Sequence, residues 1–282
     1  MVKIQNLLNV EYVVSNTKNL ELYLKLYKEC FNKYNRGLNY IDWLYKNNPE
    51  GLFLGVDIYF NNRLIGQVCG YKSSFNYKGS IKKVIVPVNV CVKKEFRKKN
   101  FFVNAVKKFE KLCYEQNIDL IIGIANKSAT PGWIRLQYNF LKSLDVFFFS
   151  ESFGLEKIEF NENIFYSKWN DDKIHWRINN PENKITLFDK NSRLIAKAGT
   201  QIPFINVIST FPNETNNKLI NLSKNKFNIF LGTIPNINKK MLKLPNVFKK
   251  SPLNFIYKDL KNENFILNKN QCFFSFLDFD AF

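Results

Sequence analysis

A cluster of basic side chains between residues 93 and 111 is the part of this sequence best suited to bind a ligand. Eight of these 19 residues are Lys or Arg and two are Glu, so the segment carries +6 of the formal net charge of +18. Arg97, Lys98 and Lys99 lie in a turn between an apolar segment, 88–92, and a segment whose pattern predicts an amphipathic helix. The free N–H groups and partial positive charge of a helix N-terminus attract anions, and these cations strengthen that field. The sequence therefore predicts a phosphate site.

The charge of the whole chain is weaker evidence than the position of these basic residues. The sequence is crowded with Lys, Asn, Ile and Phe, whose codons are rich in A and T, so a genome of low GC content would produce much of the Lys excess. A solvated run of charges is therefore the alternative to a phosphate site. A nucleic-acid-binding protein would spread basic and aromatic residues along one face, whereas here the basic residues gather at one junction. We rank nucleic-acid binding last.

The composition is that of a folded protein with two domains or one large domain. The chain has 282 residues, 45% of them hydrophobic, and its 28 Phe and 13 Tyr are too many for a disordered protein. No apolar run is long enough to predict a membrane span, and the N-terminus shows no signal-peptide cleavage site. The five Cys are scattered without a C-x-x-C spacing, which favours reduced thiols in the cytoplasm and predicts no metal site. The one His, His175, disfavours mechanisms built on a nucleophile–His pair.

The periodicity predicts a helix, a hairpin, a long strand, the basic turn, a second helix and a second strand, in that order. Apolar residues recur at helical spacing over 18–35 and again after the basic turn, where Asn117 is suited to end the helix in a left-handed conformation. Asn61-Asn62 is a hairpin signal. The other predicted elements are strands at 52–60, 63–71, 81–92, 118–125 and 146–149, a turn at 77–80 and a short helix at 133–138.

The chain partly repeats itself. The segment that begins Ile41-Asp-Trp and ends Asn-Asn-Pro-Glu50 returns at 174–182 with one residue deleted, and Asn61-Asn-Arg-Leu-Ile65 returns as Asn191-Ser-Arg-Leu-Ile195. The offsets between the copies are similar, which favours a duplication. The second copy is shorter and has no counterpart of the strand and basic turn at 88–100. We infer two related domains, of which only the first kept the phosphate site.

Four short motifs appear in a characteristic order. They are the element from Trp43 to Pro49, the strand at 88–97 that ends in Phe-Arg, the loop Asn126-Lys-Ser128, and an aromatic tail at 274–282 that contains Asp278 and Asp280. Together with the order of elements, they resemble the GNAT acyltransferase superfamily. The resemblance covers nearly the whole chain and is closest to two-domain bacterial members associated with surface-polysaccharide biosynthesis.

This resemblance implies a mixed α+β fold with two tandem GNAT-like domains. Each domain would be a mostly antiparallel, twisted sheet flanked by helices, and the second domain would be degenerate. Residues 1–150 would form the catalytic domain that binds acyl-CoA. Residues 151–282 would shape the site for the acceptor.

The resemblance also implies a role for each part of the site. The pantetheine arm of acetyl-CoA would pair with the edge of the central strand, and the pyrophosphate would bind the N–H groups that open the next helix. The implied cofactor-binding residues are Val90, Cys91, Val92, Arg97, Lys98, Lys99, Asn100, Phe101, Phe102, Asn126 and Ser128. The implied catalytic residues are Tyr138, Asp278 and Asn126. The acceptor amine would attack the thioester directly, so catalysis would mainly need positioning and groups that move protons.

Three positions depart from the family pattern. Asn100 and Phe102 stand where the family has Gly or another small residue. Asn tolerates positive φ, but the Cβ of Phe102 would crowd the phosphates unless its ring turns into the core. Trp133 stands where the family has a Tyr that acts as the general acid. Because indole cannot serve as an acid, Tyr138 is the candidate replacement. The thiolate could also leave without a protein acid.

Several of these residues have a structural interpretation as well. Asn126 and Ser128 could cap the next helix. Cys91 is explained by the alternation of side chains along its strand. Asp278 and Asp280 could belong to a solvated C-terminus.

The leading hypothesis is an N-acyltransferase that uses acetyl-CoA as donor and acts on a small-molecule amine, namely the amino sugar of a nucleotide sugar in bacterial glycan biosynthesis. The alternatives are a non-catalytic binding protein on the same scaffold, and an aminoacyl or long-acyl transferase of the same fold. The sequence determines neither the acceptor, nor the acyl length, nor the oligomeric state, so a homodimer stays open.

Overall fold

The computed structural model describes residues 10–97, 99–149, 155, 158–190, 193–200, 202–214, 227–235, 242–245 and 252–279. The chain forms two compact units, Met1–Lys72 with Pro87–Asn117, and Ser73–Val86 with Ile118–Phe282. These units are not contiguous segments, because the chain passes from one to the other inside two long strands. The division into domains 1–150 and 151–282 stays a prediction about the two repeats.

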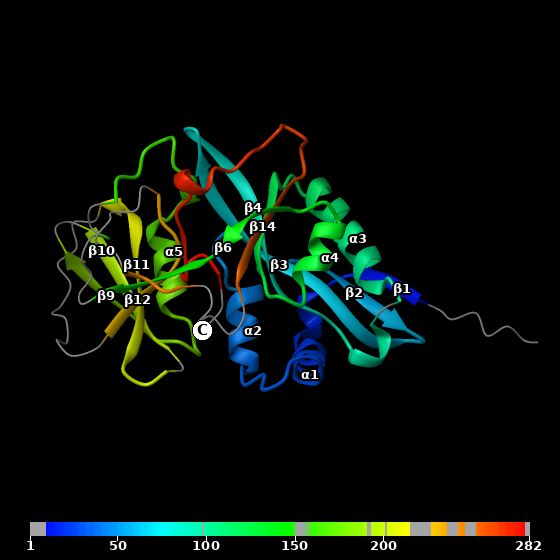
Figure 1. The fold of residues 1–282 in the computed structure, drawn as a ribbon. Coiled ribbons are helices and arrows are strands. Elements are labelled where there is room, and N and C mark those ends of the chain that lie inside the picture. Colours follow the sequence, from blue (N-terminus) through cyan, green and yellow to red (C-terminus); the bar gives the residue numbers. More distant parts are fainter. Residues whose placement is uncertain are drawn as a thin grey trace, which may run out of the picture. The chain divides into compact units, whose positions relative to one another are not determined.

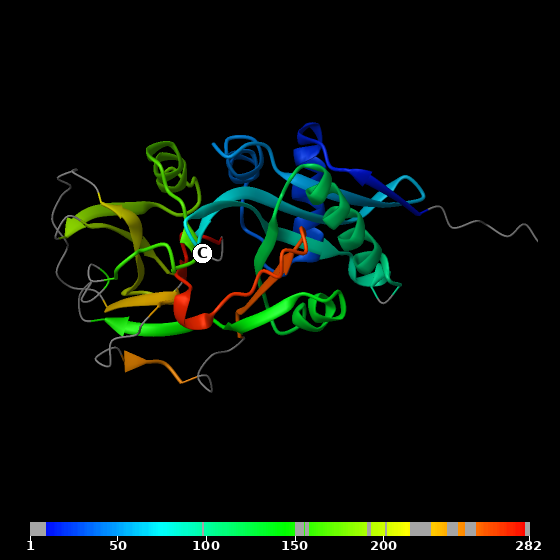
Figure 2. The same ribbon diagram turned by 90° about the horizontal axis from the view of Figure 1, so that it is seen from above.

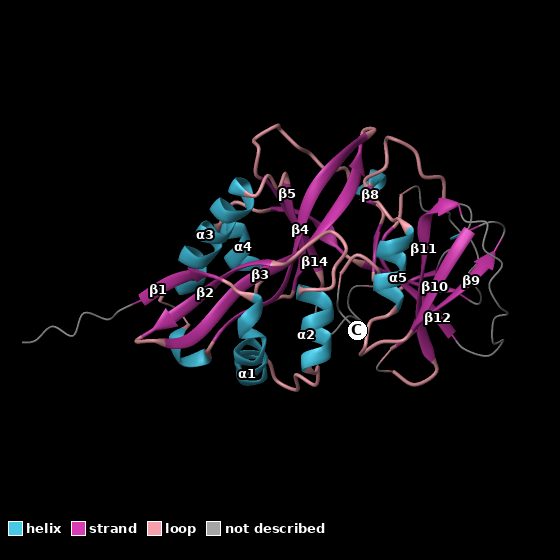
Figure 3. Cartoon of the chain, turned by 180° about the vertical axis from the view of Figure 1, so that it is seen from behind, coloured by secondary structure: helices cyan, strands magenta, loops and turns pink. Residues whose placement is uncertain are grey.

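The first unit builds helices on both faces of an antiparallel hairpin. Its elements are β1 (Val10–Val14), η1 (Thr17–Asn19), α1 (Leu20–Cys30), α2 (Leu38–Tyr45), β2 (Leu54–Phe60), the first part of β3 (Arg63–Tyr77), the last part of β4 (Ser80–Val92), η2 (Lys94–Phe96) and α3 (Phe101–Glu115). Figures 1 and 3 show α1 and α2 on one face of the β2–β3 hairpin and α3 on the other, where α3 contacts β2. This arrangement places the N-terminus of α3 just beyond the end of β4.

Tight turns of the expected chemistry close both hairpins. Asn61 and Asn62 have φ of 48° and 62°, and Lys78 and Gly79 have φ of 49° and 74°. Two consecutive residues with positive φ match the right-handed twist of the flanking strands, and Asn and Gly reach this region most readily. Both predicted turns are therefore confirmed.

The first helix is shorter than the sequence predicts. The spacing of apolar residues predicts a helix over 18–35, but α1 ends at Cys30, and Phe31 takes an extended conformation with φ −110° and ψ 124°. The ring of Phe31 stacks on that of Tyr34, with centroids 5.9 Å apart, and also packs against Tyr27. This local aromatic packing continues the apolar periodicity after the helix has ended.

The second predicted helix is α3, and its end is as expected. Ala105, Val106, Phe109 and Cys113 form its buried face. Asn117 follows the last helical turn with φ 55°, so the predicted left-handed ending is confirmed.

We expect the conformation of Asn117 to be measurable as stability. Asn117→Ala should lower the free energy of unfolding by about 1 kcal/mol, because a Cβ-bearing residue without a short polar side chain is strained at positive φ. Asn117→Gly should leave it within a few tenths of a kcal/mol of the wild type. Urea denaturation of the three proteins checks this. Equal midpoints for the Ala and Gly variants would contradict it.

The first sheet contains one parallel pair. Its strand order is β1-β2-β3-β4-β5-β14-β6, with β8 paired to β3. The strands not yet bounded are β5 (Leu120–Ala125), β6 (Asn139–Ser143), β8 (Tyr166–Ser167) and β14 (Asn254–Asp259). In the part of the chain that the structure describes, the parallel β4–β5 ladder joins only Val84 with Leu120 and Ile85 with Ile121. The remaining length of β4, from Pro87 on, belongs to the first unit.

The second sheet repeats the pattern of the first. Its order is β13-β7-β12-β11-β10-β9, with β15 paired to β12. These strands are β7 (Asp145–Phe149), β9 (Ile185–Lys190), β10 (Arg193–Gly199), β11 (Ile205–Glu214), β12 (Phe227–Thr233), β13 (Leu242–Lys243) and β15 (Phe274–Ser275). β9, β10 and β11 are antiparallel neighbours, whereas β11 and β12 are parallel, as β4 and β5 are. β11 thus takes the place of β4, so the prediction that the second repeat lacks a counterpart of this strand is wrong. A short helix, α5 (Asp171–Ile178), contacts β9 and lies along this sheet in Figure 2.

The sequence repeat corresponds to a structural repeat. α2 and α5 each precede a hairpin, and each is followed by an Asn whose side chain closes a turn. Asn48 Oδ1 accepts from the backbone N–H of Glu50 at 3.0 Å, and Asn180 Oδ1 accepts from that of Glu182 at 2.9 Å. Positions 191 and 192 of the second predicted hairpin lie outside the described residues.

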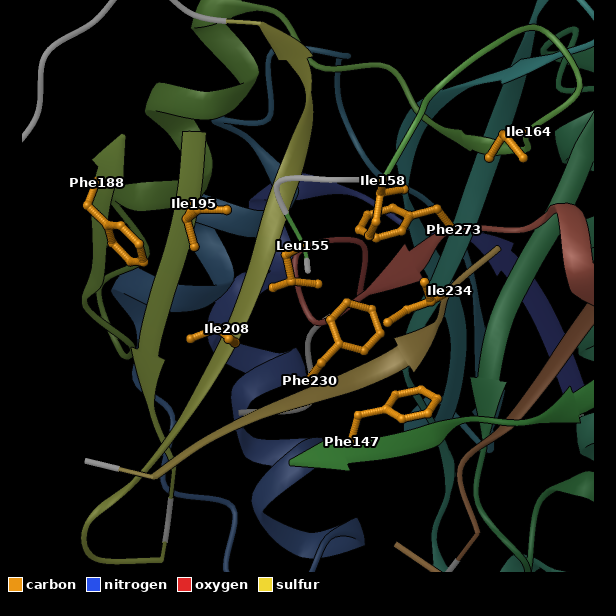
Figure 4. Close-up of a cluster of buried hydrophobic side chains, with 10 residues drawn as sticks. All are labelled: Phe147, Leu155, Ile158, Ile164, Phe188, Ile195, Ile208, Phe230, Ile234 and Phe273. Atoms are coloured by element: carbon orange, nitrogen blue, oxygen red, sulfur yellow. The ribbon is translucent and has the colours of Figure 1, made fainter. Parts of the chain in front are cut away.

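The second sheet covers an aromatic and aliphatic core. Figure 4 shows Phe147 of β7 and Phe230 of β12 beside each other, with ring centroids 6.4 Å apart. The other buried members are Leu155, Ile158, Ile164, Phe188, Ile195, Ile208, Ile234 and Phe273. β7 thus belongs to the second sheet although it precedes residue 150, and β14 belongs to the first sheet although it lies near the C-terminus.

Candidate functional site

The end of β4 is irregular where the sequence predicts the edge that binds the cofactor. Asn89 has φ 53°, which interrupts the extended backbone shortly before the strand ends at Val92. Val90 is half-buried, whereas Cys91 and Val92 are buried, with 7% of each side chain exposed. The structural interpretation of Cys91 as a core residue is therefore confirmed.

The basic turn contains both exposed and internal cations. Arg97 is exposed, and its Nε donates to the carbonyl oxygen of Val92 at 2.9 Å, which ties the side chain across the turn. Lys99 is exposed, with its Nζ 5.8 Å from the centroid of the Phe96 ring. Lys93, in contrast, is buried and pairs with Glu29 at 2.5 Å. Arg97 and Lys99 therefore remain candidates for binding an anion, and Lys98 lies outside the described residues.

The N-terminus of α3 lacks a side-chain cap. Asn100 occupies the N-cap position with φ 60° and ψ 7°, and its side chain makes no capping hydrogen bond. The first N–H groups of a helix have no partner within the helix, so this end can bind an anion. Phe101 and Phe102 are half-buried, and the Phe101 ring lies 6.4 Å from that of Phe60.

The predicted loop residues of the second unit lie at the start of a short helix. Asn126 follows β5, and its Oδ1 accepts from the backbone N–H of Ala129 at 2.9 Å. Its backbone oxygen accepts from the N–H and the hydroxyl of Thr130 at 3.0 and 2.8 Å. Asn126 thus organises the entry to α4 (Thr130–Arg135). Asn126 and Ser128 are both exposed, and their contact with a cofactor stays a prediction.

Tyr138, the predicted acid, is buried. It is 3% exposed, its ring lies edge-on to that of Trp133 at 4.7 Å, and Lys258 Nζ lies 5.2 Å from its ring centroid. Trp133 is also buried. A residue that protonates a leaving group must reach the reacting atoms. The packing of Tyr138 therefore supports a structural role, and its role as an acid stays a prediction.

Asp278 belongs to a buried polar cluster in the second unit. Its Oδ2 accepts from the backbone N–H of Ser275 at 2.8 Å, and burial raises the pKa of its carboxyl to about 6. The positive charge of Lys173 partly opposes this rise in the pKa of Asp278. Lys173 Nζ itself donates to the hydroxyls of Ser73 and Ser167 and to the carbonyl oxygen of Lys168, at 2.8 to 3.1 Å. Arg177 of α5 donates to the carbonyl oxygens of Phe276 and Phe279, each at 2.9 Å, which holds the segment around Asp278 against this helix. The predicted catalytic role of Asp278 is untested, and Asp280 lies outside the described residues.

The first unit contains a buried polar network that was not predicted from the sequence. Asp57 and Gln67 are 1% and 0% exposed, and they are joined to Tyr27 and Tyr45, which are fully buried. The network ends at Asn89 on β4. The signal in the sequence was Asp57 itself, a carboxylate in the middle of an apolar strand, where it must be hydrogen-bonded to be tolerated.

No group of three or more His, Cys, Asp or Glu side chains is placed to hold a metal ion within the described residues. Nor does any helix in the described part of the chain have the length and apolar character of a membrane span.

Comparison with known proteins identifies the fold. No protein-family model matches the sequence, and no curated protein is similar to it in sequence. A probable N-acyltransferase from Enterococcus faecalis V583 aligns over 90% of this chain and 73% of its own, with a TM-score of 0.63 and 8% identity. A GCN5-related N-acetyltransferase from Anabaena variabilis ATCC 29413 aligns over 89% and 73%, with a TM-score of 0.60 and 11% identity. The chain has the fold of the GCN5-related N-acetyltransferases.

A third structure with this GNAT fold, a GCN5-related N-acetyltransferase from Kribbella flavida, aligns over 89% of this chain and 71% of its own, with a TM-score of 0.58 and 10% identity. These alignments span both sheets, so the predicted class of two GNAT-like halves in a mixed α+β fold is confirmed. At 8–11% identity they establish the GNAT fold alone. Activity has to be argued from the site.

Proposed function

We propose that this protein is an N-acyltransferase that takes its acyl group, most simply acetyl, from a CoA thioester. The observation that carries the proposal is the junction of β4 and α3. An interrupted strand ends in a turn with exposed Arg97 and Lys99, and the next helix begins after Asn100 without a side-chain cap. This junction lies on the fold of known N-acetyltransferases.

The residues present fit the chemistry of acyl-CoA. Its pyrophosphate matches the N–H groups after Asn100 together with two cations, since anions are favoured at helix N-termini. The half-buried stretch of β4 at 88–90 lies beyond the short parallel ladder, so its backbone groups are candidates to pair with the amide groups of a pantetheine arm. Phe102 is half-buried, which supports a ring turned toward the protein at a position where the phosphates need room.

When bound, acetyl-CoA supplies an acyl group already activated as a thioester. A neutral amine attacks the carbonyl carbon, so a C–N bond forms, the C–S bond breaks and the sulfur leaves as a thiolate. The task of this chain is then to hold the two reactants and to exclude water. Protons pass from the new ammonium and to the thiolate through solvent or side chains, with Tyr138 and Asp278 as the proposed groups, and Asn126 would position a reactant by a hydrogen bond.

For the acceptor we propose the amino sugar of a nucleotide sugar in glycan biosynthesis. Its support is the resemblance of the Trp43 to Pro49 element and of the aromatic tail to two-domain bacterial transferases of that kind. We assign the second repeat, residues 151–282, to shaping this acceptor site. A transferase of aminoacyl or longer acyl groups is the nearest variant of the same proposal.

Isothermal titration with acetyl-CoA and with CoA tests the donor. We expect saturable heat at micromolar to millimolar ligand and release of free thiol when an amine acceptor is added. A panel of nucleotide-linked amino sugars against the corresponding free amino sugars then tests the acceptor class. No heat with either ligand at millimolar concentration would rule out the donor.

A non-catalytic binding protein on this scaffold is the second candidate. The burial of Trp133 and Tyr138 favours it, because the position of the acid is then part of the core. Binding of acetyl-CoA without thiol release, with every acceptor and at every pH, would select this candidate.

A further inference from the structure

A chain of buried hydrogen bonds connects Asp57 on β2 with Asn89 on β4. Gln67 Nε2 donates to Asp57 Oδ1 at 2.7 Å, and Tyr27 donates its hydroxyl proton to Gln67 Oε1. The hydroxyls of Tyr27 and Tyr45 are 2.8 Å apart, and Asn89 Nδ2 donates to the Tyr45 hydroxyl at 2.9 Å. We call these five residues the Asp57–Asn89 chain. All five lie in the first unit.

The carboxylate at one end determines the direction of every bond in this chain. Asp57 also accepts hydrogen bonds from the hydroxyls of Ser15 at 2.5 Å and Tyr23 at 2.8 Å. With the bond from Gln67, its carboxylate accepts three hydrogen bonds from side chains. Gln67 must therefore turn its NH2 group toward Asp57 and its oxygen toward Tyr27. Each tyrosine hydroxyl has one proton, so Tyr27 donates to Gln67 and must accept from Tyr45.

The same rule fixes the amide at the other end. Tyr45 has used its proton on Tyr27, so it can only accept from Asn89, and the side-chain N–H of Asn89 points to the buried tyrosine. The Oδ1 atom of Asn89, a half-buried residue, then remains as a hydrogen-bond acceptor. The orientation of the Asn89 amide is therefore set by the carboxylate of Asp57, four hydrogen bonds away along the chain.

The chain holds the backbone of β4 as well as one side chain. The thiol of Cys69 donates to the carbonyl oxygen of Val88 at 3.2 Å and lies 3.3 Å from the Tyr45 hydroxyl. Val88 and Asn89 are thus both attached to the network at the point where φ of Asn89 is 53°. A left-handed conformation costs an Asn little conformational energy. When hydrogen bonds hold it in place, it also fixes the direction of the neighbouring backbone N–H and C=O groups.

We propose that Asp57 is a positioning residue for the acyl transfer, which orients Asn89 so that its Oδ1 accepts a hydrogen bond from an N–H group of a bound reactant. This inference rests on the proposed function. The N–H could belong to the attacking amine or to an amide of the pantetheine arm. Both are N–H donors that would lie along β4, and the measurements below separate them.

The variant Asp57→Asn tests the direction of the chain with almost no change in shape. The amide has one acceptor oxygen where the carboxylate has two, so it no longer accepts from Ser15, Tyr23 and Gln67 together and no longer fixes Gln67 in one orientation. We expect the reversed chain, in which Asn89 directs its oxygen to Tyr45 and its N–H outward, to become populated. The variant Tyr45→Phe removes the hydroxyl that joins Asn89 to Tyr27, and it replaces the first variant if that one does not fold. Asp42→Asn, a half-exposed carboxyl on α2, is the matched control.

The first readout needs neither ligand nor activity. In ligand-free protein, the side-chain amide protons of Asn89 should exchange slowly with solvent by NMR. In Asp57→Asn and Tyr45→Phe that exchange should be at least tenfold faster, with Asp42→Asn unchanged. Equal exchange rates in all four proteins would overturn the inference, whether or not the protein is an acyltransferase.

The second readout tests the function of the orientation. We expect Asp57→Asn to lose tenfold or more in kcat/KM at a melting temperature close to that of the wild type. A weaker acetyl-CoA affinity by titration would assign the N–H to the pantetheine arm, and a higher KM for the amine would assign it to the acceptor. Kinetics and affinity equal to those of Asp42→Asn would overturn the positioning role. A wild type without binding or turnover would instead sink the proposed function, while the exchange rates still decide the direction of the chain.

Discussion

Reversing the charges of Arg97 and Lys99 to Glu should weaken acetyl-CoA binding roughly 100-fold. A unit charge about 4 Å from an anion contributes about 1 kcal/mol in water, so reversal changes each interaction by about 2 kcal/mol before salt screening. Both side chains are exposed beside the uncapped start of α3, where they are accessible to a bound anion. Isothermal titration at low and high KCl measures it, and the difference should shrink as salt rises.

The matched control for this experiment is Lys107→Glu with Lys111→Glu. These residues are exposed on α3 beyond its first turn, and the double variant changes the net charge by the same amount. We expect its affinity to stay within about threefold of the wild type, because a field falls off beyond the first helical turn. Lys99→Glu alone separates charge from the hydrogen bond between Arg97 and the Val92 carbonyl. Equal affinities for the two double variants would remove the turn from the site.

Replacing Asp278 by Asn should remove a pH dependence of stability between about pH 4 and pH 6. The folded protein raises the pKa of Asp278 from 3.8 to about 6, mainly by burial, against the opposing charges of Lys173 and Arg177. In that interval the unfolded chain has released the proton and the folded chain retains it. The stability of the wild type therefore falls as pH rises toward 6 and is level above it.

The expected size of this effect is about 3 kcal/mol, since each pKa unit corresponds to about 1.4 kcal/mol. Asp278→Asn resembles the protonated form at every pH, so the difference in free energy of unfolding between variant and wild type should grow by that amount from pH 4 to pH 6. Urea denaturation across this range measures it. Glu159→Gln, at an exposed carboxyl, is the control. A difference that is flat with pH would contradict a buried, protonated Asp278.

The same variant decides whether Asp278 acts in catalysis. A base that removes the amine proton cannot be replaced by an amide, so turnover would be lost at all pH values. If turnover persists, the role of Asp278 is structural: its carboxyl accepts from the Ser275 N–H and stabilises the turn at residues 275–278. The geometry favours this second outcome, because the carboxyl is buried with its partners inside the second unit.

Local features of this protein follow from the sequence because they depend on neighbouring residues. The Asn61-Asn62 and Lys78-Gly79 turns, the left-handed Asn117 after α3 and the Asx turns at Asn48 and Asn180 each need only the backbone preferences of a few residues. The same holds for the basic turn that opens α3. The repeat was also visible, since both copies kept the turn chemistry after α2 and α5.

What the tertiary structure decided involves residues far apart in the chain. β14 enters the first sheet and β7 the second, and no local pattern encodes such long-range pairing. Tyr138 is buried because Trp133 and Lys258 pack on it, which the spacing of a motif does not reveal.

The basic turn and the Asp57–Asn89 chain show the same division at the candidate site. The sequence by itself predicts an anion site at this turn, because a helix N-terminus and its adjacent cations are contiguous in the chain. Only the tertiary structure showed what holds the interrupted strand beside it. A buried carboxylate must collect its donors from wherever the fold brings them, and here they are Ser15, Tyr23 of α1 and Gln67 of β3, with α2 and β4 joined further along the chain of hydrogen bonds.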